Sequence, residues 1–329
     1  MSEQHSDRHR DEASDDTGAS GVTEKDNGGD DADGFEFWAK LGLLVAATAV
    51  LAWAVAWLRL GLFSVAVHAF VIPLLGLLTL PLILWGPIKA LFNPPLVRRS
   101  RVIAFFALLA VGFVCNVPQI PAPVSTEDFE SAHEYRLPFD GEWTVTAGGD
   151  SFATNYHATT AAYRWAYDFA PFEDGERHEG EGEELDDYYC YGEPVLASAA
   201  GEVVEIDEGY EDNEPREPNA ETPLGNYVVL EVDDDEYLYV AHMKEDSLTV
   251  AEGDTIDAGQ KIGECGNSGR SLEPHVHVHL QNVLDFPMAE GLPLRFSNYE
   301  EDGEVVEIGS PEGSTDSDKP ADGARVRQR

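Results

Sequence analysis

Acidic side chains are missing from one long stretch of the chain. Residues 37–126 contain no aspartate or glutamate, whereas the rest of the 329-residue chain holds all 62 acidic residues and only 15 basic ones. Basic residues are scarce overall, and the net charge of −41 excludes a nucleic-acid-binding surface. Apolar residues make up 43% of the chain, which excludes disorder throughout. We therefore expect an apolar segment joined to a folded, acidic one.

The acidic residues are spread along the remaining sequence. A surface this acidic repels itself at low ionic strength, and a Debye length of about 3 Å at 1 M salt removes most of that repulsion. The composition favours adaptation to high salt, of the haloarchaeal kind. The alternative is an ordinary acidic protein with solvated charges. Neither interpretation indicates a mechanism.

The stretch without acids contains apolar runs that predict about three transmembrane helices, at about residues 38–58, 62–86 and 102–120. Basic residues gather between the second and third runs, so the positive-inside rule places that loop and the amino terminus in the cytoplasm. Arg59, in the short outer turn, departs from this rule unless its side chain reaches the interface. The prediction is a multi-pass protein of the cell membrane, anchored in the lipid bilayer, with its carboxyl-terminal domain extracellular.

Composition also predicts the domain organisation. The segment before the apolar runs is polar and unable to fold, and short β-rich runs separated by glycine, proline, asparagine and aspartate follow a proline-rich linker. The predicted order is a disordered acidic tail (1–36), a membrane domain (37–120), a linker (121–130), an all-β domain of antiparallel sheets (131–299) and a mainly disordered polar tail (300–329).

Cysteine is rare, with three residues in the chain: Cys115, Cys190 and Cys265. The last two thiols are too few for a disulfide framework, and neither has a second cysteine nearby with which to hold a metal. Cys190 and Cys265 either form one bridge or are two small packed side chains. The sequence leaves their redox state open.

Residues 274–279 read Pro-His-Val-His-Val-His and are the strongest local signal. On a strand, successive side chains alternate between faces, so His275, His277 and His279 share one face and the two valines the other. Exposed strand faces usually carry threonine, lysine or glutamate. Three imidazoles on one face instead favour a metal site, and neutral imidazole suits zinc.

A catalytic zinc ion usually has three protein ligands and a water molecule, so further ligands must come from elsewhere. Asp168 lies among aromatic and apolar residues, where an unpaired carboxylate is costly to bury. His157 lies shortly before it, and His242 ends another β-rich run. Each of these three residues is a candidate for the site, and each could equally be structural.

Residues 194–281 resemble the lysostaphin-type zinc metallopeptidases, metallopeptidase family twenty-three, whose members cut peptide crosslinks in bacterial walls. The resemblance rests on segments in the family's order: 193–204 (EPVLASAAGEVV), 225–229 (GNYVV), 239–242 (YVAH), 252–263 (EGDTIDAGQKIG), 266–271 (GNSGRS) and 274–277 (PHVH). It implies an all-β peptidase fold of the duplicated hybrid motif kind. It also implies a bound Zn²⁺ ion.

The family pattern implies a role for each matching residue. His277 and Asp168 would be zinc ligands together with an upstream histidine, and His275 and His242 would form the catalytic pair. One of the pair would be the general base and the other would hydrogen-bond the developing oxyanion. The sequence does not say which does which.

The chain departs from the family pattern at the first ligand. That position, four residues before the aspartate, is Arg164, whose guanidinium cannot bind a metal. We take His157 as its replacement, with His133 and His178 as weaker candidates. His279 stands where the family has glutamine or glutamate, and we expect it to orient a neighbouring ligand.

These observations predict a membrane-anchored zinc metalloendopeptidase, which hydrolyses peptide bonds through a zinc-activated water. The alternative is a catalytically inactive zinc-binding or adapter domain of the same fold that acts by protein–protein docking, which the arginine at the ligand position favours. A lipoyl or biotinyl carrier hairpin fits poorly, because residues 243–244 do not match the carrier lysine motif. The expected substrate is a peptide or cell-surface polypeptide, and acidic loops near the site disfavour anionic ones.

Overall fold

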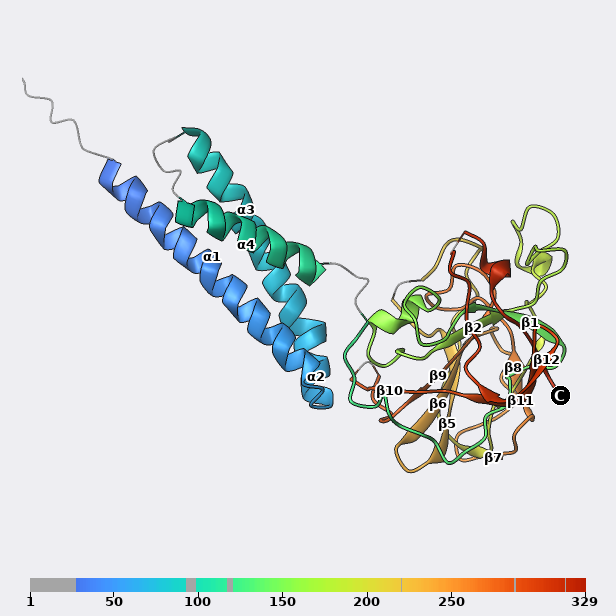
Figure 1. Cartoon of the computed structure of the whole chain (residues 1–329). Helices are drawn as coiled ribbons and strands as arrows, with labels where there is room; N and C mark the ends of the chain where they lie inside the picture. Colours follow the sequence, from blue (N-terminus) through green and yellow to red (C-terminus); the bar gives the residue numbers. More distant parts are fainter. Residues whose placement is uncertain (1–27, 93–98, 117–120, 220, 287, 317) are drawn as a thin grey trace, which may run out of the picture.

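The computed structural model describes residues 28–92, 99–116, 121–219, 221–286, 288–316 and 318–329. A group of apolar helices precedes a β domain that is built mainly from one large sheet (Figure 1). The predicted disordered tail lies outside the described residues up to position 27. Residues 28–36 belong instead to the first helix, so the tail was predicted too long.

The helical region has the elements α1 (Gly28–Trp57), α2 (Leu62–Ala66), a π-helical turn (Val67–Val71), α3 (Ile72–Phe92) and α4 (Arg99–Asn116). Among the described residues, two helical stretches are long and apolar enough to cross a membrane, Glu36–Trp57 and Leu62–Trp85. The apolar part of α4, Val102–Cys115, is shorter. The prediction of about three such helices is therefore corrected to two, because arginines occupy the first turn of α4.

The helices pack through small side chains. Ala49, Ala52 and Ala56 of α1 are buried, whereas Leu44 of the same helix is 63% exposed. Gly112 of α4 is needed for close approach, because a Cβ atom there would lie 2.6 Å from Oγ1 of Thr79 in α3. Apolar side chains thus cover the outside of the helical region, and small ones line its contacts.

The β domain is antiparallel, as the sequence predicts. Its large sheet has the strand order β12-β11-β13-β1-β2-β9-β6-β5-β4-β7, with β10 paired to β9, and β3 and β8 form a separate pair. The strands are β1 (Glu142–Ala147), β2 (Tyr167–Ala170), β3 (Pro194–Leu196), β4 (Gly201–Asp207), β5 (Asn226–Asp233), β6 (Glu236–Met243), β7 (Thr255–Ile256), β8 (Lys261–Glu264), β9 (Val276–Gln281), β10 (Gly291–Leu292), β11 (Phe296–Glu301), β12 (Glu304–Gly309) and β13 (Arg325–Gln328).

Strand β9 lies near the middle of the large sheet. Its residues Val276, Val278 and Leu280 are fully buried in the main hydrophobic core. The alternate residues His277 and His279 lie on the opposite face and are also buried. The alternation of side chains along a strand therefore separates the core from a buried polar face.

The carboxyl-terminal residues are not the disordered tail that the sequence predicts. Strands β12 and β13 lie within residues 300–329, and β13 is inserted between β1 and β11. Val326 is fully buried opposite Trp143 of β1. A single buried valine and the sheet hydrogen bonds on both sides hold this strand, and neither is visible as a hydrophobic pattern.

The predicted linker packs closely on the β domain. The backbone N–H and the hydroxyl of Ser125 both donate to the buried carboxylate of Glu290. Val65 of α2 and Trp165 belong to one small buried cluster with linker residues. The α1–α2 turn also contacts this region, because Arg59 forms an ion pair with Glu127.

Candidate metal centre

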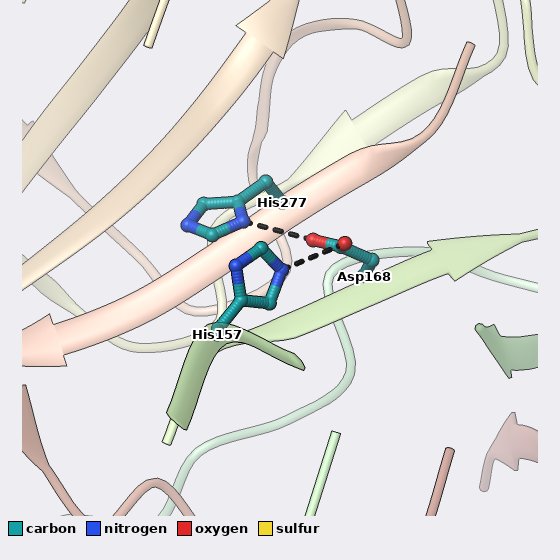
Figure 2. A group of neighbouring side chains, drawn as sticks. All are labelled: His157, Asp168 and His277. Carbon is teal, nitrogen blue, oxygen red and sulfur yellow. Dashed lines mark hydrogen bonds and ion pairs between the residues drawn. The ribbon is translucent and has the colours of Figure 1, made fainter. Parts of the chain in front are cut away.

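The centre begins with two neighbouring strands. Asp168 on β2 is the register partner of His277 on β9, so the antiparallel pairing sets both side chains on one face. Nδ1 of His277 lies 2.8 Å from Oδ1 of Asp168 (Figure 2). Both side chains are nearly inaccessible to solvent.

His157 reaches the same carboxylate from a short 3-10 helix, Tyr156–Thr159. Asn155 caps this helix: its side chain accepts from the His157 N–H and donates to the carbonyl groups of Gly149 and Ala166. Nε2 of His157 then lies 2.8 Å from Oδ2 of Asp168 (Figure 2). One ligand atom from each of the two histidines and the aspartate lies within 4.8 Å of the others.

A chain of hydrogen bonds sets the tautomer of His277. Burial chiefly lowers the pKa of His277 to about 4 and that of His279 well below its usual range, so each ring is neutral and carries one N–H. Gln281 donates its amide N–H to the Val283 carbonyl, so its oxygen accepts from Nε2 of His279, at 3.2 Å. Nδ1 of His279 therefore accepts from Nε2 of His277, at 3.0 Å.

This tautomer leaves the lone pair of His277 Nδ1 facing an oxygen of Asp168. Burial opposes ionisation of Asp168, but the facing His157 and His275 and the hydrogen bond of His157 outweigh it and hold its pKa well below the usual range. Two acceptors would then face each other at 2.8 Å without a proton between them. A cation bound to both groups satisfies them, and a His-Asp-His set of donors suits zinc.

His275 and His242 lie beside these three residues. Nε2 of His275 is 3.6 Å from Oδ1 of Asp168, and the ring centroids of His242 and His275 are 4.8 Å apart. The ring of His242 is also 5.6 Å from that of His277. The structure thus brings all five residues that the sequence singles out as ligands or catalytic groups into one cluster.

Backbone carbonyl groups hold both of these rings in one tautomer. Nδ1 of His275 lies 2.8 Å from the Glu273 carbonyl, and Nδ1 of His242 lies 2.9 Å from the Ser268 carbonyl. A carbonyl only accepts, so Nδ1 donates in both rings, and in the neutral form of each ring Nε2 keeps its lone pair. His242 also has a φ of 61°, a left-handed conformation that is uncommon outside glycine and often found at functional sites.

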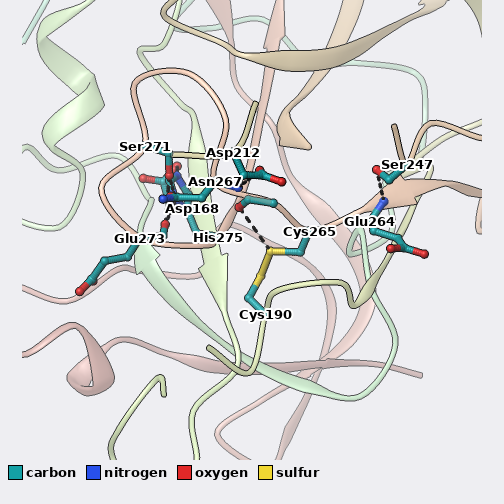
Figure 3. The surroundings of a disulfide bond; sticks show 11 residues. Asp168, Cys190, Asp212, Ser247, Glu264, Cys265, Asn267, Ser271, Glu273 and His275 are labelled. Atoms are coloured by element: carbon teal, nitrogen blue, oxygen red, sulfur yellow. Dashed lines mark hydrogen bonds and ion pairs between the residues drawn. A yellow bond between two sulfur atoms is a disulfide. The ribbon is translucent and has the colours of Figure 1, made fainter. Parts of the chain in front are cut away.

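A disulfide lies next to the segment that supplies these carbonyls. Cys190 and Cys265 are bonded with their Cα atoms 5.7 Å apart, which resolves the alternatives that the sequence leaves open (Figure 3). Two residues later, the N–H of Asn267 donates to Asp212. The bridge therefore anchors the start of the segment that leads to His275.

The other predicted candidates lie elsewhere. The Arg164 guanidinium packs over the Trp165 ring and donates to the Asp150 carbonyl. His133 pairs with Asp233, and the ring of His178 contacts Tyr188. His279 lies next to His277, as expected of a residue that orients a ligand.

The sequence analysis missed two groups at the centre. Tyr156 donates its hydroxyl to Oδ2 of Asp168, although the residue is 58% exposed. Asn155 positions His157 through its capping bonds. Both directly precede His157, and the Asn-Tyr-His order could have suggested a helix cap at Asn155.

Comparison with known proteins finds a match over part of the β domain. A model of peptidase family M23 matches residues 185–288, which include His242, His275 and His277 but neither His157 nor Asp168. Murein hydrolase activator NlpD of Salmonella dublin is 29% identical over 134 residues, which are 41% of this chain and 32% of NlpD. The match therefore spans only about a third of the length of that relative.

Solved structures give weaker matches. A zinc-containing peptidase from Vibrio cholerae is 21% identical, covers 45% of this chain and 36% of its own, and has a TM-score of 0.29. The catalytic domain of lysostaphin from Staphylococcus simulans is 20% identical, covers 50% of this chain and 90% of its own, and has a TM-score of 0.26. Such scores establish no shared overall fold. Over residues 185–288 the β domain is similar in sequence to peptidase family M23.

Proposed function

We propose that the chain is a membrane-anchored zinc metalloendopeptidase that cleaves polypeptides at the cell surface. The observation that carries this proposal is the pair of facing acceptors, His277 Nδ1 and Asp168 Oδ1. Beside them lie the imidazoles of His242 and His275, whose Nε2 atoms carry no hydrogen in the neutral form. The first feature calls for a cation, and the second supplies bases. Together they suit hydrolysis at a metal better than a purely structural role.

In this proposal His157, Asp168 and His277 hold the zinc. When bound, zinc lowers the pKa of a water molecule towards about 7 and polarises the scissile carbonyl. His275 or His242 takes a proton from the attacking water at Nε2. Burial and the neighbouring His275 and His277 lower the pKa of His242 well below its usual range, so this ring begins neutral.

The tautomer with its hydrogen on Nδ1 changes which roles His242 and His275 can take in the proposed hydrolysis. A neutral ring whose Nδ1–H is held by a carbonyl has no hydrogen left at Nε2. His242 therefore cannot donate to an oxyanion until it has been protonated. We propose that whichever ring accepts the water proton then becomes the donor, first to the oxyanion and then to the leaving amine.

The apolar helices support membrane anchoring. Their outward leucine and phenylalanine side chains and buried small residues are typical of helices packed in lipid. The Cys190–Cys265 bridge supports an oxidising compartment for the β domain. We propose a multi-pass topology with the amino terminus in the cytoplasm and the β domain outside, as the positive-inside rule indicates. Two crossings would return the chain to the cytoplasm, so this topology requires the shorter apolar helix α4 to cross the membrane as well.

The acidic surface supports the proposal of a high-salt environment. Assays should therefore be run in molar KCl, because salt screens the repulsion among the acidic side chains. The test uses the full-length chain in detergent under these conditions, with zinc measured by elemental analysis and hydrolysis by digestion of a peptide library. We expect one zinc per chain and cleavage. His277→Ala should lose zinc, whereas His242→Ala should keep zinc and lose hydrolysis. Stoichiometric zinc in His277→Ala would contradict the ligand assignment.

Two findings favour a second candidate, an inactive docking domain. The curated relative is named an activator of murein hydrolases, and the family match omits two of the three proposed ligands. An adapter would remain folded without hydrolysing any peptide. A folded wild-type chain that binds no zinc would rule out the peptidase and leave the adapter.

A further inference from the structure

A cavity of about 360 Å³ opens beside the candidate metal centre. The cavity is lined by three aromatic rings, two leucines and two carboxylates, and the residues that matter here are Glu205, Tyr227, Tyr239, Asp285 and Phe286. None of them has a part in the proposed hydrolysis. The cavity is therefore a feature that the proposed function has not used.

Sheet register joins this cavity to the metal centre. His279 on β9 is the partner of Tyr239 on β6, Tyr239 is the partner of Val229 on β5, and Val229 is the partner of Glu205 on β4. Directly opposed residues share a face of an antiparallel sheet. A row of side chains thus runs across the strands from the histidines to Glu205.

Contacts between aromatic rings also link the cavity to the histidines of the metal centre. Tyr239 stacks on His279 with centroids 4.7 Å apart, and Phe286 stacks on Tyr163 at 4.9 Å. Tyr163 in turn lies 5.3 Å from the His277 ring. A polypeptide bound at the metal centre would therefore find this cavity along the same face.

Among the described residues, the carboxylates of the cavity have no basic partner. None of the ion pairs among described residues involves Glu205 or Asp285. Glu205 is half-buried and accepts the Tyr227 hydroxyl at Oε1, which leaves Oε2 available. Burial raises the pKa of Tyr239, and Glu205 and Asp285 raise it further, as expected of a negative potential.

We propose that this cavity is a subsite for a basic side chain, arginine or lysine, of the polypeptide substrate. Aromatic rings attract an organic cation through their faces, and the two carboxylates complement its charge. Stacking against rings also excludes water, so this attraction survives molar salt better than an exposed ion pair does. The assignment as a substrate subsite rests on the proposed peptidase function, but the binding itself does not.

The first experiment measures binding without catalysis. N-acetyl-argininamide and its uncharged counterpart N-acetyl-citrullinamide are titrated into the metal-free full-length chain in molar KCl and followed by NMR or calorimetry. We expect the arginine compound to bind at least about tenfold more tightly, a difference of about 1.4 kcal/mol. Equal affinity for the two compounds would overturn the proposal.

Variants locate the binding. Glu205→Gln removes the charge but keeps an oxygen for the Tyr227 hydroxyl, and Asp285→Asn alters an exposed residue, so both should fold. Each variant should weaken the binding of N-acetyl-argininamide several-fold. Glu202→Gln, at an exposed carboxylate on the same strand but outside the cavity, is the matched control and should have no effect. Equal losses of affinity in Glu205→Gln and Glu202→Gln would mean that the overall negative charge of the chain causes the effect. Such a result would also overturn the proposal.

Hydrolysis of peptide pairs then separates this proposal from the proposed function. Arginine peptides should show a lower KM than citrulline peptides in the wild type, and Glu205→Gln should remove the difference while kcat is retained. Binding of argininamide by a chain that cleaves nothing would support the cavity as a cation site and contradict the peptidase. Cleavage without any preference for arginine or lysine would contradict the subsite and leave the peptidase intact.

Discussion

The helical region and the β domain expose opposite kinds of side chain. In the helices, Leu44 and Phe113 face outwards, while Ala49 and Thr79 are buried. In the β domain the large apolar residues are inside, and the acidic ones cover the surface. One chain therefore contains two surfaces that suit two different solvents.

This difference also determines where a titratable centre can form. The helices between residues 37 and 116 contain no carboxylate, so a centre built on a carboxylate cannot form there. The β domain instead buries Asp168 among imidazoles and offsets the cost through hydrogen bonds and facing charge. Changes to the β domain should therefore alter the centre and leave the helices unaffected.

The largest effect is expected from the disulfide. Replacing both Cys190 and Cys265 with alanine should lower the free energy of unfolding of the β domain by about 4 kcal/mol, because the bridge closes a long loop. Helical circular dichroism from the apolar region should be retained. Cys115→Ala in α4 is the control and should leave the β domain unchanged. A loss below about 1 kcal/mol in the double variant would show that the bridge contributes little.

The next largest effect is expected on the pH dependence of the stability of the metal-free chain. The pKa of His277 is lowered from 6.5 to about 4, chiefly by burial. As pH falls through this interval, the unfolded chain takes up a proton that the folded chain does not. The contribution of His277 to the free energy of unfolding is thus fully present above about pH 6.5 and is lost by about pH 4, a change of about 3 kcal/mol.

His277→Gln supplies the comparison for this measurement. Denaturant unfolding of both chains, followed by near-ultraviolet circular dichroism, should show a pH slope smaller by up to about 1.4 kcal/mol per pH unit in the variant. Asp168 does not interfere, because its lowered pKa affects stability only below its unfolded value of 3.8. Identical slopes would mean that His277 titrates normally in the folded chain.

The smallest effect is expected where the two regions meet. Arg59→Gln removes the ion pair with Glu127, and since both side chains are partly exposed the loss should be at most about 1 kcal/mol. Hydrogen exchange in residues 121–130 should quicken slightly. Glu127→Gln should do the same, and the double variant should be no worse than either single one. Additive effects would show that the two residues do not interact.

Local pattern predicted much of the β domain. Alternation in residues 274–279 places Val276 and Val278 in the core and His277 on the other face, as observed. The antiparallel architecture followed from short β-rich runs and turn residues. Strand β13 was missed because Val326 alone gives no apolar pattern, and its place depends on pairing with β1, far away in sequence.

The sequence suggests which residues form the site, but the way they converge depends on the fold. Asp168 meets His277 because β2 and β9 pair in one particular register. His157 reaches them only because Asn155 caps a short helix at the right place. The tautomers of the rings depend on acceptors such as the Ser268 carbonyl, which no residue identity encodes.

The ion pair of Arg59 with Glu127 and the cluster that Val65 shares with Trp165 join the α1–α2 end of the helical region to the β domain. A domain that is tethered at one point can swivel, whereas one that is held at two points keeps a fixed orientation. The face with the histidines would then stand at a constant height and tilt above the lipid. In the proposed membrane-anchored peptidase, this arrangement would select targets by how far they project from the membrane as well as by their sequence.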